Sequence, residues 1–122
     1  MQLTRDSGTQ HIIRAWEPGR VRIGERWVAG NVIVSTDEIV ESWTTAALTA
    51  LTVEDLAPAL AFAPTIVLLG TGTDKFLPDV ELMAALAEQR VGLEIMSTPA
   101  ACRTFNVLVQ ERRRVVAALF NP

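Results

Sequence analysis

An uninterrupted apolar run, Thr65-Ile66-Val67-Leu68-Leu69-Gly70, stands near the middle of the chain. Most of its residues are strong strand formers, so we expect a β-strand there. A strand that lacks polar alternation has both of its faces buried. The run therefore predicts the central strand of a sheet that is covered on both sides by other elements.

The chain after this strand alternates between helical and strand patterns. Apolar residues recur at helical spacing over residues 79–90, which predicts a helix that Gly92 closes. Residues 93–96 and 115–120 are short apolar segments typical of strands. Strands that alternate with helices indicate a layered α/β domain, at least partly parallel, in which residues 92–96 lie parallel to the central strand.

A third helix is expected between these last two strands. Thr98 is a suitable cap, and Pro99 fits the first helical position because its missing N–H costs nothing there. This helix is predicted to extend to about residue 111. Its inward face would carry Cys102 and Phe105.

The N-terminal part is rich in strand formers and is punctuated by turn sequences. The predicted strands there cover residues 10–16, 20–23, 26–35 and 38–43. A short helix over residues 53–61, capped by Thr52, follows them.

Composition limits the classes of function. The 122 residues fit one domain, 1–122, and 49% hydrophobic with 20% charged residues is typical of a folded chain. A net charge of −3 argues against nucleic acid as a partner. No apolar run approaches the roughly 20 residues of a membrane span, and no secretory leader is evident, so we expect a cytoplasmic protein.

The sequence also lacks the residues for metal or disulfide chemistry. Its single cysteine, Cys102, excludes an internal disulfide and a cysteine-based metal site, and the single histidine, His11, supplies too few zinc ligands. No catalytic residue, cofactor or metal site is predicted. Cys102 is expected to be a buried, slowly reacting thiol because it falls on the apolar face of its helix.

The glycine-rich segment after the central strand has two interpretations. Gly70 and Gly72 resemble a nucleotide-binding loop, but Lys75 stands where a dinucleotide fingerprint has its third glycine. The structural alternative is that two glycines allow the tight backbone needed to leave a buried strand. We favour the structural reason, since an isolated glycine motif is a weak signal.

Parallel strands would nevertheless bring two loops to one sheet edge, where open α/β sheets bind ligands. Helix N-termini in this crevice would suit an anion or a carboxylate. The candidate crevice residues are Gly70, Thr71, Gly72, Thr73, Lys75, Thr98, Arg103 and Asn106. For Asn106, a side-chain hydrogen bond to a neighbouring segment is an equally simple explanation.

Three segments resemble a known family: Gly70-Thr71-Gly72 with Pro78, then residues 92–98, then Ala101-Cys102-Arg103-Thr104-Phe105-Asn106-Val107-Leu108. The chain is similar to the Mth-type domain family of unknown function, which includes mitochondrial respiratory complex I assembly factor three and the adipogenesis-associated Mth domain protein. Phe105 stands where the family often has tyrosine, and Arg112 where it usually has a turn glycine. The resemblance implies a three-layer α/β fold with a mixed central sheet and helices on both faces.

Two functional hypotheses follow. The first is a non-enzymatic protein-binding or complex-assembly module, because the chain lacks a nucleophile–base pair or a metal cluster and resembles a family with assembly factors. Trp16, Trp27 and Trp43 are mainly core candidates, but one exposed among apolar groups would mark a partner surface. The second hypothesis is a small-ligand domain or enzyme that uses the crevice.

Overall fold

The computed structural model describes residues 11–73 and 79–121. Its elements in chain order are β1 (Ile13–Glu17), β2 (Arg20–Ile23), β3 (Arg26–Ala29), β4 (Val32–Val34), β5 (Ile39–Glu41), the 3-10 helices Leu48–Ala50 and Glu54–Leu56, α1 (Ala57–Leu60), β6 (Ile66–Thr71), α2 (Val80–Glu88), β7 (Gly92–Met96), α3 (Thr98–Gln110) and β8 (Val115–Phe120).

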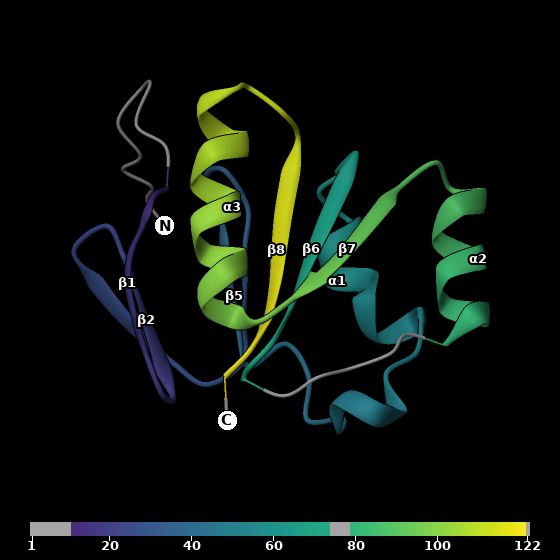
Figure 1. Cartoon of the computed structure of the whole chain (residues 1–122), viewed down its shortest axis with the longest axis horizontal. Helices are drawn as coiled ribbons and strands as arrows, with labels where there is room; N and C mark the ends of the chain where they lie inside the picture. Colours follow the sequence, from purple (N-terminus) through teal and green to yellow (C-terminus); the bar gives the residue numbers. More distant parts are fainter. Residues whose placement is uncertain (1–10, 74–78, 122) are drawn as a thin grey trace.

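The strands form two sheets (Figure 1). The larger has the order β5-β4-β8-β6-β7, in which β6 is parallel to β7 and to β8 while β4 is antiparallel to β8. The predicted central strand is therefore interior and parallel to its expected neighbour, as predicted, although β8 holds the middle position. The smaller sheet is the antiparallel set β1-β2-β3.

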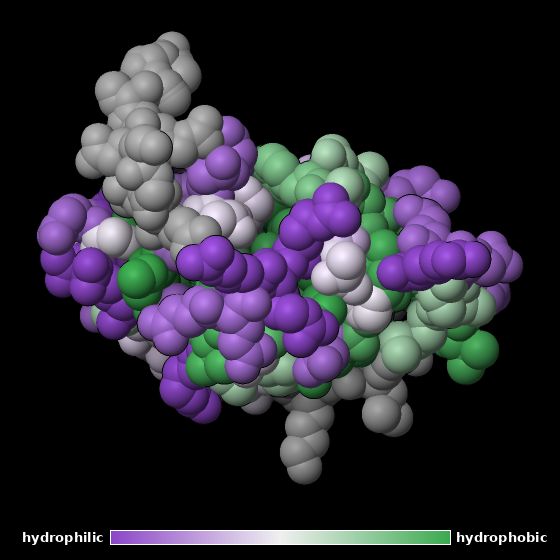
Figure 2. All heavy atoms as spheres, turned by 90° about the horizontal axis from the view of Figure 1, so that it is seen from above, coloured by the Kyte–Doolittle hydropathy of each residue, from purple (hydrophilic) through white to green (hydrophobic). Residues whose placement is uncertain are grey.

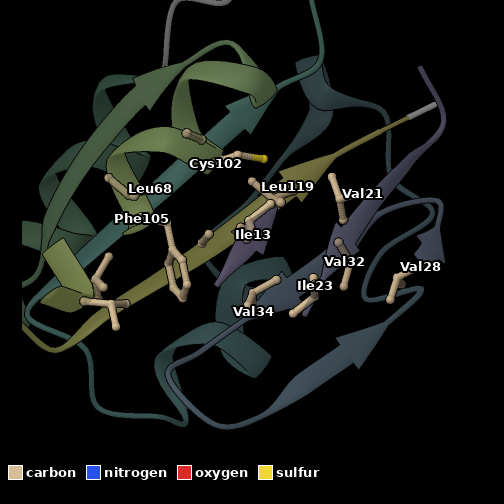
Figure 3. Close-up of a cluster of buried hydrophobic side chains, with 14 of the residues drawn as sticks. Ile13, Val21, Ile23, Val28, Val32, Val34, Leu68, Cys102, Phe105 and Leu119 are labelled. Atoms are coloured by element: carbon tan, nitrogen blue, oxygen red, sulfur yellow. The ribbon is translucent and has the colours of Figure 1, made fainter. Parts of the chain in front are cut away.

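Two apolar clusters cover the two faces of the larger sheet. On one face, α3 and the smaller sheet pack against alternate residues of β6 and β8, with Phe105 fully buried among them (Figure 3). On the other face, α1, α2 and Trp43 pack against the intervening residues. The mixed sheet between two covering layers confirms the three-layer α/β fold.

The predicted strand over residues 26–35 was wrong. It is two strands, β3 and β4, which belong to different sheets. Gly30 lies between them with φ of +81°, a left-handed conformation that breaks an extended chain. Asn31 then fixes the chain to the larger sheet, because its side-chain oxygen accepts from the Asn121 N–H at 2.8 Å and its amide donates to the Thr44 carbonyl.

The predicted helix over residues 53–61 is also divided. The Thr52 N–H donates to the Asp55 carboxylate and the Asp55 N–H donates to the Thr52 hydroxyl, but the N-cap of the turn that follows is Val53 rather than the predicted Thr52. A 3-10 turn and the short α1 follow in place of one helix. Pro58 explains the break, because proline has no N–H to donate to a carbonyl four residues earlier.

The ends of α2 and α3 place arginine where glycine is usual. Arg90 and Arg112 both have φ of +61°, and each directly follows the C-cap residue of its helix. The next residue then bonds back to the helix, as when the Arg113 N–H donates to the Leu108 carbonyl at 3.0 Å. The turn at Arg112 thus tolerates a non-glycine residue. The helix predicted over residues 79–90 ends at Glu88, the positive φ that terminates it is at Arg90, and Gly92, predicted to close it, is the first residue of β7.

Candidate functional site

The carboxyl end of β6 and the start of α3 meet in direct contact. The Gly72 N–H donates to the Thr98 hydroxyl at 2.7 Å, and the Thr98 N–H donates to the Gly72 carbonyl at 2.8 Å. Thr98 is fully buried there. We call Gly70, Thr71, Gly72 and Thr98 the α3 junction.

Thr98 also connects this junction to β8. Its hydroxyl donates to the Phe120 carbonyl at 2.7 Å while it accepts from Gly72. Gly70 allows the close approach, because a Cβ atom there would lie 2.9 Å from Thr98 Oγ1 and 3.1 Å from Thr98 Cα. One threonine side chain thereby holds the ends of β6 and β8 against the first turn of α3.

The N-terminus of α3 differs from the prediction. Ser97, not Thr98, is the N-cap, since its hydroxyl accepts from the Ala100 N–H at 3.3 Å. The Ala101 N–H donates to the Ser97 carbonyl, and Pro99 has no N–H. The N–H groups of the first turn are therefore bonded within the protein, and none of these four positions offers a free donor to an anion.

The other predicted crevice residues are dispersed. Thr73 is exposed beyond the junction, and Lys75 lies outside the described residues. Arg103 is exposed on α3. Asn106 binds β1 instead, because its side chain accepts from the Ile13 N–H and donates to the Ile13 carbonyl, both at 2.9 Å.

These positions change what the crevice hypothesis requires. The structure brings together Gly70, Thr71, Gly72 and Thr98, and it uses the hydrogen-bonding groups of Gly72 and Thr98 internally. An anion site at this edge of the sheet would rest on Thr73 and Lys75. In the part of the chain that the structure describes, no group of three or more His, Cys, Asp or Glu side chains is placed to hold a metal ion.

Cys102 lies on the inward face of α3 and is 5% exposed. Burial raises the pKa of its thiol to about 12, and the nearby positive charge of Arg103 opposes that shift without overcoming it. The thiol is therefore protonated at neutral pH. Since the thiolate is the nucleophile, this cysteine is unsuited to covalent catalysis.

We predict that the native protein reacts slowly with a thiol reagent such as Ellman's reagent at pH 7.5, and that unfolding in concentrated urea makes the reaction fast. Both burial and the pKa of about 12 suppress the reactive thiolate in the folded state. The measurement is the absorbance time course of thiol release. Complete reaction of the folded protein at the unfolded rate would contradict this.

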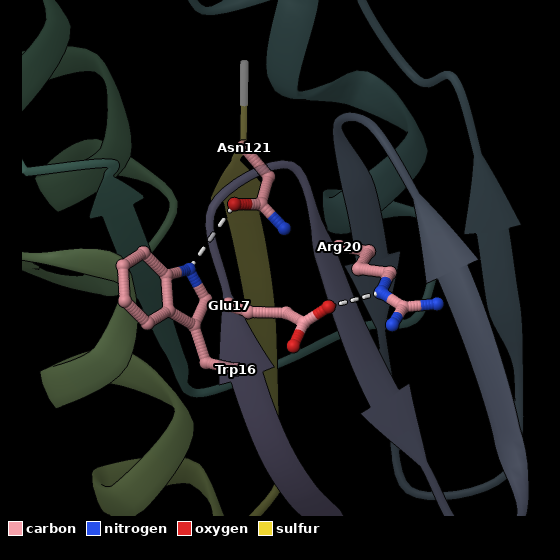
Figure 4. A network of polar contacts seen from close by, with 4 residues as sticks. All are labelled: Trp16, Glu17, Arg20 and Asn121. Carbon is pink, nitrogen blue, oxygen red and sulfur yellow. Dashed lines mark hydrogen bonds and ion pairs between the residues drawn. The ribbon is translucent and has the colours of Figure 1, made fainter.

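The three tryptophans have different environments. Trp43 is buried, donates to the Leu119 carbonyl at 3.2 Å and packs edge-on against Phe120. Trp16 is half-buried, and its indole N–H donates to the Asn121 side-chain oxygen at 3.1 Å (Figure 4). Only Trp27 among these three is exposed, at 38%.

Trp27 lies on the outer face of the smaller sheet. The guanidinium of Arg20 stands 4.0 Å above its ring centroid, and the same Arg20 pairs with Glu17 (Figure 4). Its strand, β3, pairs only with β2 among the described strands. An exposed aromatic ring on a strand with an unpaired edge is a candidate surface for another protein.

The space-filling view in Figure 2 shows hydrophobic residues in several places between hydrophilic ones on one face of the molecule. Within residues 11–73 and 79–121, the exposed large hydrophobic residues other than Trp27 are Val80, Met83 and Val107. They belong to α2 and α3 and not to the smaller sheet. Among the described residues, no helix is long and apolar enough to cross a bilayer.

The chain is similar over its whole length to a zebrafish (Danio rerio) protein named NADH dehydrogenase [ubiquinone] 1 alpha subcomplex assembly factor 3. The two are 31% identical over 100% of this chain and 70% of the relative. A Francisella tularensis protein named 13 kDa major membrane protein is 39% identical over 46% of each chain.

Solved structures agree with the fold. A Bordetella parapertussis protein superimposes with a TM-score of 0.86, at 30% identity, over 96% of this chain and all of that one. A Bordetella pertussis protein described as a Mth938-like domain has a TM-score of 0.77 at 24% identity, over 99% of this chain and 92% of that one, which shows the shared fold. The resemblance to the Mth-type domain family is thus confirmed. A family model also matches residues 13–120, and the chain therefore belongs to the family described as protein of unknown function DUF498/DUF598.

Proposed function

We propose that this chain is a non-enzymatic protein-binding module that assists the assembly of a larger complex, and that it binds its partner through the outer face of the sheet β1-β2-β3. The observation that carries this proposal is the exposed Trp27 with Arg20 stacked on its ring. Tryptophan and arginine dominate the binding energy of many protein interfaces. The zebrafish relative that matches the whole of this chain is named an assembly factor, which supports the same role.

The groups around Trp27 suit a partner that is both apolar and polar. Arg20 and Arg22 flank the ring on β2, and each is paired with a glutamate, Glu17 or Glu25. The positive charges beside the ring are thus balanced by carboxylates, whereas the apolar ring itself remains exposed. A partner would bury the ring and keep the ion pairs at the rim, as in standard interfaces.

We expect affinity capture of the tagged chain from its native cell to recover a protein in stoichiometric amount, and Trp27→Ala to abolish that recovery. Met83→Ala is the matched control, because Met83 is similarly exposed at 39% but lies on α2, far along the chain from the smaller sheet. Circular dichroism of each variant checks that the fold is intact. Equal recovery with Trp27→Ala and wild type would overturn the proposed surface.

Two further arms of this experiment separate the remaining possibilities. Lys75→Ala should keep the captured partner, whereas loss of the partner with that variant would favour the crevice. We also propose a cytoplasmic location, so the complex should be recovered from the soluble fraction. Recovery only from the membrane fraction would contradict that location and agree with the name of the Francisella relative.

A further inference from the structure

A groove lies between β1 and the first half of α3, and neither the four residues of the α3 junction nor Trp27 line it. Its volume is about 280 Å³. The side chains that define it are Ile13, Arg14, Trp16, Pro99, Cys102 and Arg103. We call it the β1–α3 groove. It combines apolar walls with two arginines that come from opposite sides, one from a strand and one from a helix.

A β-bulge places the first arginine. In the pairing of β1 with β2, Ile13 is opposite Ile23 and Ala15 is opposite Arg22, so Arg14 is the extra residue without a partner. The Asn106 side chain of α3 holds the backbone of Ile13 through two hydrogen bonds. Bulges re-aim side chains and are frequent beside binding sites. Here the bulge directs Arg14 to the groove next to α3.

Neither arginine of the groove is paired with a carboxylate in the described part of the chain. The three arginines of β2 and β3 each pair with a glutamate, namely Arg20 with Glu17, Arg22 with Glu25 and Arg26 with Glu41. Arg14 and Arg103, in contrast, form no ion pair within residues 11–73 and 79–121, and no acidic side chain is among those that line the groove. Two positive charges therefore face one groove in a chain whose net charge is −3.

The apolar residues of the groove also come from both β1 and α3, and they are held in place. The indole N–H of Trp16 is bonded to Asn121, which fixes the ring (Figure 4). Pro99 is conformationally rigid, and Cys102 presents a neutral thiol from the adjacent turn of α3 (Figure 3). Rigid walls lower the entropic cost of binding a small molecule.

We infer that the β1–α3 groove binds a small organic carboxylate, whose carboxylate group is held by Arg14 and Arg103 and whose apolar part lies against Trp16 and Pro99. Guanidinium groups match a carboxylate with paired, charge-assisted hydrogen bonds. This inference is independent of the protein-binding proposal, which rests on Trp27 on the outer face of the smaller sheet.

The test is a nuclear magnetic resonance titration of the full ¹⁵N-labelled chain with hexanoate. Binding should shift the indole N–H resonance of Trp16, and Arg14→Gln and Arg103→Gln should each weaken the affinity at least tenfold. Arg90→Gln is the matched control, because Arg90 is an exposed arginine outside the groove, and it should leave the affinity unchanged. Unchanged melting temperatures establish that the variants are folded.

Titrations with hexanol and with inorganic phosphate test separately the contributions of the apolar part and the charged part of the ligand. Both should bind more weakly than hexanoate, because hexanol lacks the charge and phosphate lacks the apolar body. Equal binding of hexanol would overturn the role of the arginines, and equal binding of phosphate would overturn the apolar half of the site. Failure of hexanoate to bind, together with loss of a captured protein in Arg14→Gln, would assign the groove to a macromolecular partner instead.

Discussion

Replacing Thr98 with valine is expected to lower the free energy of unfolding by about 2–4 kcal/mol. Valine keeps the shape of threonine but has no hydroxyl, so the Gly72 N–H loses its acceptor and the Phe120 carbonyl loses a donor. All three residues are buried, and each buried polar group left without a partner costs about 1–3 kcal/mol. Urea denaturation monitored by circular dichroism measures the change.

Thr98→Ser is the control for this substitution. Serine keeps the hydroxyl and loses only a methyl group, which is worth about 1 kcal/mol when buried. We therefore expect Thr98→Ser to be clearly more stable than Thr98→Val. If the two variants were equally destabilised, packing rather than the hydroxyl would hold the α3 junction together.

Gly70→Ala is expected to destabilise the fold by about 1–3 kcal/mol, the usual range for overpacking a core. The added Cβ atom would lie 2.9 Å from both Thr98 Oγ1 and Leu119 Cδ2, so α3 must move away from the sheet. The Thr98 side chain resists this movement, because two hydrogen bonds fix it. Thermal or urea unfolding measures the loss.

Gly92→Ala is the matched control in the neighbouring strand β7. A Cβ atom at Gly92 meets nothing closer than the Thr65 carbonyl at 3.7 Å, which is an ordinary contact. The free energy of unfolding of the Gly92→Ala variant should therefore stay within about 0.5 kcal/mol of wild type, as for most exposed positions. Equal stability of the two alanine variants would mean that α3 does not pack closely on β6.

The local patterns predicted the C-terminal half of the fold well. The apolar run at residues 65–70 corresponds to β6, and the segments at 93–96 and 115–120 correspond to β7 and β8. The prediction was weaker in the N-terminal part, where residues 26–35 formed two strands. A single glycine in a strand pattern can mark a bulge or a break, and only the sheet that each half joins distinguishes them.

The candidate site was less accessible to prediction than the fold. Gly70, Gly72 and Thr98 were identified from turn and helix-start signals, and the structure places them together. Their role as an internal connection depends on the Phe120 carbonyl, which no local pattern relates to Thr98. The structural explanation of Asn106 as a side-chain bond to a neighbouring segment agrees with its pair of bonds to Ile13.

The sequence by itself determined which segments become strands and helices in the second half of the chain, because hydrophobic periodicity and capping residues act over a few neighbouring positions. The tertiary structure alone decided where Arg14 and Arg103 lie. They are distant in sequence, and a bulge in β1 together with the packing of α3 brings them to one groove. It also decided that Trp27 is exposed while Trp43 is buried, since burial depends on which elements cover a face.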